Sequence, residues 1–241
     1  MIMTTALSPV RQPVIPPPVG MVVVFSDIAC PWGSLAVHRL RARRTALGLD
    51  GDVAIDHRAF PLELINKRGT PKKVIDAETE VIADHDPSLG WKPWTLDDFA
   101  YPSSVLMALE AVQAAKEPRV GGMRISEELD AALRHAFYAE GRPIGLLSTI
   151  LEVAKEVDEL NACALGELLE SGTARRLVFE QWRQAVRLKV QGSPHLFMPD
   201  GTDVHNPGIE LHWLEGKLGK RPVIDADDPL IYDDLLHRTT G

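Results

Sequence analysis

The chain has 241 residues, which suits one large domain or a domain carrying an insertion. Hydrophobic residues make up 45% and charged residues 25%, a globular composition that excludes a wholly disordered or collagen-like chain. The formal net charge of −8 argues against a nucleic-acid-binding protein, because such proteins normally carry a basic surface.

No stretch reaches the ~18 consecutive apolar residues needed to span a bilayer. The first residues lack the charged and apolar regions of an export signal. Only Cys30 and Cys163 are present, so disulfide cross-links are not expected to hold the fold. We therefore expect a cytoplasmic protein that binds neither nucleic acid nor a membrane.

The amino-terminal part predicts an extended arm followed by the start of an α/β domain. Residues 1–19 are rich in proline and should form the arm. The apolar run 21–27 predicts a strand that is buried on both faces. A helix is expected from Pro31 to about Gly48, because proline is tolerated at the first helical position, and residues 53–58 predict a second strand.

The middle of the chain predicts helices. Residues 67–100 are polar, acidic and turn-rich, and from Pro102 onward the apolar spacing is helical. Capping residues define the expected helix starts: Ser126, Thr149 and Asn161. Residues 67–189 are therefore expected to form an all-helical insertion.

The chain then returns to β-structure. Residues 195–198 and 202–205 flank Pro-Asp-Gly and predict a hairpin. A last helix is expected from Pro207-Gly208 through Leu214, followed by an acidic tail over 221–241. Segments 20–66 and 190–220 would then form one discontinuous α/β domain around the insertion.

Cys30 is the strongest candidate for a reactive residue, because it lies where a buried strand is followed by a helix. The free N–H groups and the dipole at a helix amino terminus favour a thiolate over a thiol. A thiolate is the nucleophile in exchange, conjugation and reduction reactions. The alternative is a small buried apolar residue without chemistry.

The segment Asp-Ile-Ala-Cys-Pro-Trp (27–32) resembles the active-site opening of the DsbA-like, FrnE-type thioredoxin-fold proteins, which carry Asp-x-x-Cys-Pro-Trp-Cys. This resemblance implies a thioredoxin-like α/β domain with an all-helical insertion. Gln-Gly-Ser-Pro (191–194) resembles the family's second motif, whose proline is cis and faces the cysteine. The expected site residues are then Cys30 as nucleophile, with Pro31, Trp32, Gly33, Ser193, Pro194 and His195 around the substrate.

The sequence departs from the family at one position, because Gly33 stands where the second cysteine is expected. A dithiol oxidoreductase needs that thiol to resolve a mixed disulfide. Cys163 is the only other cysteine. It lies on a predicted helix, and we expect its side chain to be buried by packing. What remains is single-thiol exchange, in which a glutathione- or mycothiol-like thiol is the cosubstrate and no cofactor is bound tightly.

Two rival functions stay open. On the same fold, 2-hydroxychromene-2-carboxylate isomerase and the kappa-class glutathione transferases use a bound thiol cofactor, which a serine at the nucleophile position holds. The other rival is a degenerate thioredoxin-like binding protein. The expected partner is a small thiol, disulfide or electrophile, and a homodimer is left open.

For most of the other candidate residues, structural roles are expected. Asp84, His85 and Asp86 are expected to form a solvated acidic loop rather than a metal site. Trp91 and Trp94 either cover the site as a lid or pack within the insertion, and packing is favoured. For His195, exposure on the hairpin and interaction with the thiolate are equally open. The arginines between 39 and 44 are expected on the solvated face of the first helix.

Overall fold

The computed structural model describes residues 16–216 and 219–240, and its centre is a four-stranded sheet. The strands β1 (Met21–Ser26), β2 (Ala54–Ala59), β3 (His195–Phe197) and β4 (Asp203–His205) lie in the order β2-β1-β3-β4. β1 and β2 are parallel, whereas β3 is antiparallel to β1 and β4 is antiparallel to β3. The predicted strand–helix–strand opening and the later hairpin are confirmed, but most of the predicted arm lies outside the described residues.

Helices cover both faces of this sheet. α1 (Pro31–Ala46) and α9 (Ile231–Thr240) pack on one face, where Val22 and Val24 of β1 point. α8 (Arg175–Leu188) packs on the other face, where Val23 and Phe25 point. Because successive residues of a strand point to opposite faces, β1 is buried on both sides, as its apolar run predicts.

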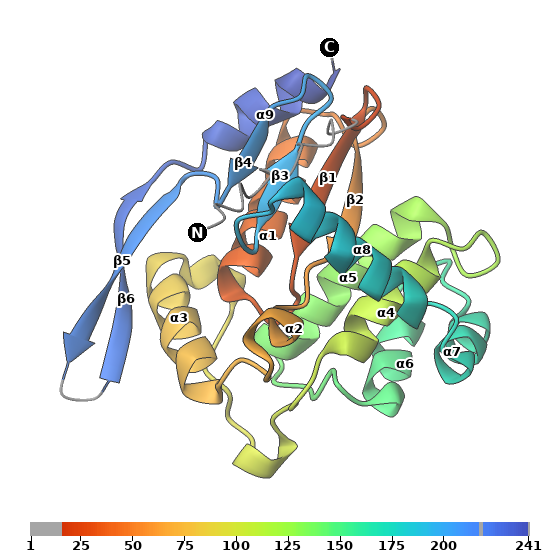
Figure 1. Ribbon diagram of the computed structural model, residues 1–241, viewed down its shortest axis with the longest axis horizontal. Coiled ribbons are helices and arrows are strands. Elements are labelled where there is room, and N and C mark those ends of the chain that lie inside the picture. Colours follow the sequence, from red (N-terminus) through yellow and green to blue (C-terminus); the bar gives the residue numbers. More distant parts are fainter. Residues whose placement is uncertain (1–15, 217–218, 241) are drawn as a thin grey trace, which may run out of the picture.

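The insertion helices form a core of their own beside the sheet (Figure 1). They are α4 (Leu106–Ala115), α5 (Met123–Tyr138), α6 (Leu147–Lys155) and α7 (Ala162–Ser171). The side chain of Asn161 caps α7, as predicted. Ser126 and Thr149 are not caps, because α5 and α6 begin earlier and bury both side chains. Within the described part of the chain, no helix combines the length and the apolar character of a membrane span.

The turn-rich segment predicted over 67–100 contains a helix that the sequence pattern does not reveal. α2 (Leu62–Asn66) is followed by α3 (Lys72–His85) and by the short 3-10 helices η1 (Pro87–Leu89) and η2 (Asp98–Ala100). α3 buries only Ile75, Thr79 and Ile82, a narrow stripe among charged residues. It lies against α1 and β6, apart from the other insertion helices (Figure 1).

The predictions for the carboxyl-terminal part are wrong. The expected helix at 207–214 is strand β5 (Ile209–Gly216), which pairs with β6 (Gly219–Asp227) in an antiparallel ribbon that projects beside α3 (Figure 1). The expected acidic tail supplies β6 and α9.

The acidic residues of this part bind the arginines of α1. Arg39 and Asp227 form two hydrogen bonds of 2.6 and 2.7 Å, and Arg43 pairs with Asp233. Arg39 is buried, so it does not lie on a solvated face of α1 as expected.

Removal of the Asp227 charge should destabilise the protein, because it leaves the buried Arg39 guanidinium without its partner. We expect Asp227→Asn to lower the free energy of unfolding by ~2–4 kcal/mol. The control is Glu215→Gln, which breaks an exposed pair with Lys220 and should change stability by less than ~0.5 kcal/mol. Denaturant unfolding measures both, and equal small losses in the two variants would contradict this account.

Candidate functional site

Cys30 is the amino-terminal cap of α1, at the end of the loop that leaves β1. Its sulfur accepts a hydrogen bond from the Gly33 N–H, with an N–S distance of 3.4 Å. Pro31 begins the helix, as predicted, because its missing N–H costs nothing at this position. The Cys30 side chain is nonetheless buried, with 6% of the residue exposed.

The predicted second motif lies directly beside this sulfur. The Ser193–Pro194 peptide bond is cis, and the carbonyl oxygen of Ser193 accepts a hydrogen bond from the Cys30 thiol at 3.2 Å. The hydroxyl of Ser193 in turn accepts a hydrogen bond from the Asp27 N–H at 2.9 Å. The structure therefore brings together residues that are 163 positions apart in the chain.

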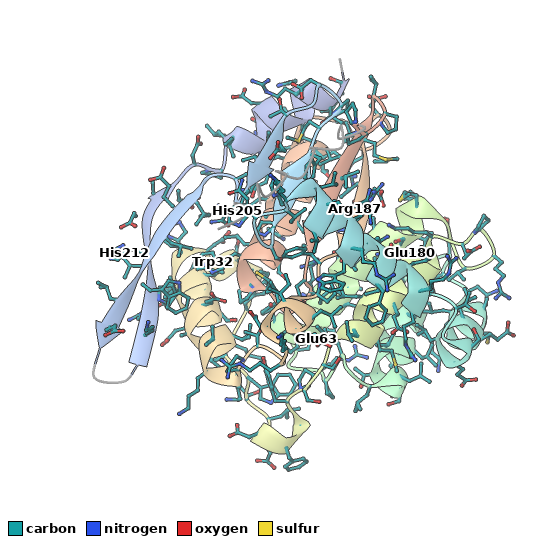
Figure 2. All side chains as sticks on the ribbon, in the orientation of Figure 1. Trp32, Glu63, Glu180, Arg187, His205 and His212 are labelled. Carbon is teal, nitrogen blue, oxygen red and sulfur yellow. The ribbon has the colours of Figure 1, made fainter. Side chains whose placement is uncertain are left out.

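Apolar side chains from distant elements close the site over Cys30. Trp32 packs next to it and donates a hydrogen bond from its indole nitrogen to Glu78 of α3 at 3.0 Å, and Figure 2 shows it at the amino end of α1 on the side of α3. Leu89 of η1 and Ile209 of the ribbon complete the buried cluster. The sequence pattern predicted neither α3 nor the β5–β6 ribbon, so the burial of Cys30 by these parts of the chain was not predicted.

Burial reverses the predicted ionisation of the cysteine. Loss of hydration, with a smaller contribution from the negative charge of Glu78, raises the pKa of the Cys30 thiol to about 12. The hydrogen bonds from Ser193 and from the Gly33 N–H lower the pKa but do not compensate. The expected thiolate is therefore a neutral thiol at pH 7.

Two carboxyl groups near the sulfur, the buried Asp27 and the half-buried Glu78, titrate close to neutrality. Burial raises the pKa of Asp27 to about 6, although its oxygens accept hydrogen bonds from the N–H groups of Ala29 and Leu62 at 2.8 and 2.7 Å. Burial likewise raises the pKa of Glu78 to about 7. The folded state binds these protons more tightly than the unfolded state, so both groups should lower stability as the pH rises from about 4 to 7.

Comparisons with known proteins identify the family to which this fold belongs. The family model for the DSBA-like thioredoxin domain matches residues 21–219. The chain belongs to this family.

Three solved structures illustrate the shared fold, all at identities that support fold similarity only. A probable DsbA oxidoreductase from Streptomyces coelicolor is 20% identical, with a TM-score of 0.63 over 91% of this chain and 89% of that one. A 2-hydroxychromene-2-carboxylate isomerase is 18% identical, with a TM-score of 0.56 over 76% and 87%. The cytosolic disulfide reductase DsbM from Pseudomonas aeruginosa, solved with GSH, is 19% identical, with a TM-score of 0.56 over 90% and 96%. The search of curated proteins finds no match.

A buried arginine of the insertion holds the active-site loop of this DsbA-like domain. Arg134 of α5 pairs with Asp130 and donates hydrogen bonds to the Asp27 carbonyl, the Ser26 hydroxyl and the Ser34 hydroxyl at 2.8–3.2 Å. Sequence reasoning missed this residue, because an arginine on a helix with many charged residues is usually solvated.

Aromatic residues of the insertion support the same loop. Tyr138 donates a hydrogen bond to the Ile28 carbonyl at 3.2 Å, and Trp91 stacks on Tyr138 with ring centroids 4.7 Å apart. Trp94 is buried against Phe137. Trp91 and Trp94 therefore pack against aromatic residues of the insertion, which is the alternative that the sequence favours over a lid.

His195 is buried, which excludes the first of its two open alternatives, exposure to water on the hairpin. Its Nδ1 accepts a hydrogen bond from the Gln191 N–H at 3.1 Å, and its Nε2 lies 2.8 Å from Asp203 Oδ1. Both ring nitrogens thus have protein partners and neither is left for the thiol. The side chain instead fixes the turn that carries Ser193 and Pro194.

The remaining candidates lie outside the site. Cys163 is exposed on α7 and does not pack inside the insertion as expected, and both cysteines are free thiols. His85 lies 2.6 Å from Asp227 rather than in a metal site. In the described residues, no group of three or more His, Cys, Asp or Glu side chains could hold a metal.

Space for a small ligand lies along α1, next to the site. A cavity of about 270 Å³ lies between α1, α5 and η1. Its lining includes Ser34, one helical turn beyond Cys30, together with His38, Trp91 and His135. It is large enough for part of a small-molecule cosubstrate.

Replacement of Glu78 should make Cys30 more reactive, because it removes a negative charge that opposes the thiolate. In a Cys163→Ser background, we expect Glu78→Gln to raise the rate of Cys30 alkylation at pH 8 roughly tenfold, or about one pKa unit. Near pH 5.5 Glu78 is mostly protonated, so the two proteins should alkylate at similar rates.

Glu80→Gln is the matched control, since Glu80 lies on the same helix and is exposed. It should leave the alkylation rate unchanged at both pH values. Equal rates for the Glu78 and Glu80 variants at pH 8 would show that the Glu78 charge does not act on the sulfur.

Proposed function

We propose that this DsbA-like protein carries out thiol-dependent chemistry on a small molecule in the reducing cytoplasm, with Cys30 as the only reacting sulfur. The observation that carries the proposal is the hydrogen bond between Cys30 and the Ser193 carbonyl, in a motif with no second thiol. Cys163 lies on α7 in the insertion and is not part of the buried cluster around Cys30, which supports a mechanism that does not use it.

The first candidate reaction is monothiol exchange. The Cys30 thiolate attacks one sulfur of a disulfide, a mixed disulfide forms, and the other sulfur leaves as a thiolate that takes up a proton. A low-molecular-weight thiol of the glutathione or mycothiol type then attacks the mixed disulfide and releases Cys30. Among the described residues no group accepts a hydrogen bond from the Ser193 N–H, so that N–H is available to an extended substrate.

The second candidate is an isomerase or transferase that uses a bound thiol cosubstrate. The raised pKa of Cys30 favours this role, because a neutral thiol can donate a hydrogen bond to the thiolate of the cosubstrate. No bond to Cys30 then forms or breaks. The structural neighbours support a thiol cosubstrate, since one was solved with GSH and another is an isomerase.

Substitution of Cys30 by serine separates the two candidates. In exchange, Cys30→Ser should reduce glutathione-dependent disulfide reduction to the uncatalysed rate, because a serine hydroxyl is not a nucleophile at its ordinary pKa. In the second candidate, serine keeps a hydrogen-bond donor and activity largely survives, whereas Cys30→Ala lowers it. The assay is turnover of a small disulfide or electrophile with glutathione or mycothiol.

Cys163→Ser is the control and should leave turnover unchanged. In the Cys163→Ser background, mass spectrometry after incubation with a small disulfide should show one mixed disulfide, and Cys30→Ser should abolish it. Full turnover in both Cys30→Ser and Cys30→Ala would refute a role of this sulfur, and no turnover by the unmodified protein would favour a binding protein.

A further inference from the structure

The cavity between α1, α5 and η1 shares a wall with the buried cluster around Cys30. Leu89 lines the cavity and also belongs to that cluster. Trp91, a second lining residue, packs against the same cluster. Cys30 itself is not among the residues that line the cavity, so a ligand that lies wholly inside it would contact this wall without touching the sulfur.

Every ionisable residue that lines the cavity, among those that the structure describes, is basic. They are His38 and Arg41 of α1 and Arg134 and His135 of α5. Arg41 makes three hydrogen bonds, to Glu127 and Glu128. A guanidinium group carries five N–H donors, so at least two donors of Arg41 are left without a protein acceptor.

The two histidines add hydrogen-bond donors that the protein does not use. In the described part of the chain, the ring of His38 makes no hydrogen bond, and even a neutral imidazole carries one N–H donor. The Nε2 atom of His135 lies 3.6 Å from Glu140 Oε1, beyond ordinary hydrogen-bond distance. Arg134, by contrast, uses its donors on Asp130 and on the active-site loop. The cavity therefore offers donors to an acceptor from α1 and from α5.

Apolar side chains form the rest of the wall and limit the size of the ligand. They are Val37, Leu89, Trp91 and Ala131. An apolar cavity of ~150 Å³ accepts a benzene-sized ligand. A volume of about 270 Å³ thus leaves room for one ring and a carboxylate group. The ring would pack against the Trp91 indole, and the carboxylate would accept hydrogen bonds from the basic residues.

We propose that this cavity is a second ligand site, which binds a small organic acid with one carboxylate and one apolar ring and thereby holds Leu89 in place over Cys30. The proposal goes beyond the proposed function and does not depend on which reaction Cys30 carries out. The ligand is separate from the thiol cosubstrate, because that thiol must reach the sulfur. A buried thiol reacts only when its surroundings open locally, and a ligand that packs on Leu89 in the observed arrangement favours that arrangement.

Benzoate is the probe for this site, and benzamide is its matched neutral control. By isothermal titration calorimetry, we expect benzoate to bind at least fivefold more tightly than benzamide. His38→Leu changes an exposed residue and should weaken benzoate binding at least threefold while leaving benzamide unaffected. No detectable binding of benzoate at millimolar concentration, or equal affinity for the two probes, would overturn the proposal.

The location of the probe is tested by filling the cavity. Ala131→Leu places a larger side chain in it and should weaken benzoate binding at least tenfold. Ala42→Leu is the matched control, since Ala42 is exposed on α1 and does not line the cavity, and it should leave the affinity unchanged. Equal affinities in the two leucine variants would show that benzoate binds elsewhere. Displacement of benzoate by glutathione would assign the cavity to the thiol cosubstrate and contradict a separate ligand.

The link to Cys30 has its own readout. In a Cys163→Ser background, we expect saturating benzoate to slow alkylation of Cys30 by iodoacetamide at pH 8 at least threefold. The same concentration should have no effect in the Ala131→Leu variant. An unchanged rate in the protein with its cavity saturated would show that the ligand does not hold Leu89 over the sulfur.

These measurements are independent of turnover. Cys30→Ala should bind benzoate as tightly as the parent protein, because Cys30 does not line the cavity. Turnover that survives Cys30→Ala would refute the proposed function and leave the benzoate site intact. Failure of benzoate to bind would refute the second site while turnover still depends on Cys30.

Discussion

The chemistry of this protein depends on how completely one sulfur atom is removed from water. Cys30 has the usual help of a helix amino terminus, because the Gly33 N–H donates to its sulfur. Burial outweighs that help, and the pKa of the thiol rises to about 12. The groups responsible are Trp32, Leu89 and Ile209, which close over the sulfur, and Glu78, whose charge opposes ionisation. The side chains that bury Cys30 therefore control its reactivity as much as the Cys-Pro-Trp-Gly motif does.

The parts of the fold that were predictable are those in which local pattern and final structure agree. β1 and α1 follow from an apolar run and a proline at the first helical position, and the hairpin of β3 and β4 follows from Pro-Asp-Gly. α3 was missed because three buried residues in fourteen make too narrow a stripe, so its helix depends on contacts with α1 and β6. The ribbon and α9 were missed because their acidic residues suggested a tail, whereas Asp227 and Asp233 bind arginines of α1.

The site shows the same division between local and distant information. The position of Cys30 at a helix start is local and was predicted, and the approach of Ser193 followed from the resemblance to a family. The direction of the pKa shift could not be predicted, because it depends on residues more than forty positions away in the chain, such as Glu78. His195 was uncertain for a related reason, since its role is set by Gln191 and Asp203 across a turn and a strand pair.

A buried, neutral thiol is compatible with the proposed function, in which Cys30 is the only reacting sulfur. Oxidation of cysteine follows thiolate character and exposure, so the resting state of Cys30 resists it. A dithiol site can bury its sulfurs in an internal disulfide, but Gly33 removes that option here. Asp27 and Glu78 make the electrostatics around Cys30 dependent on pH, because both carboxyl groups change charge between about pH 6 and 7. Burial accounts for most of the rise in the pKa of Cys30, and the negative charges of Glu78 and Asp27 add to it.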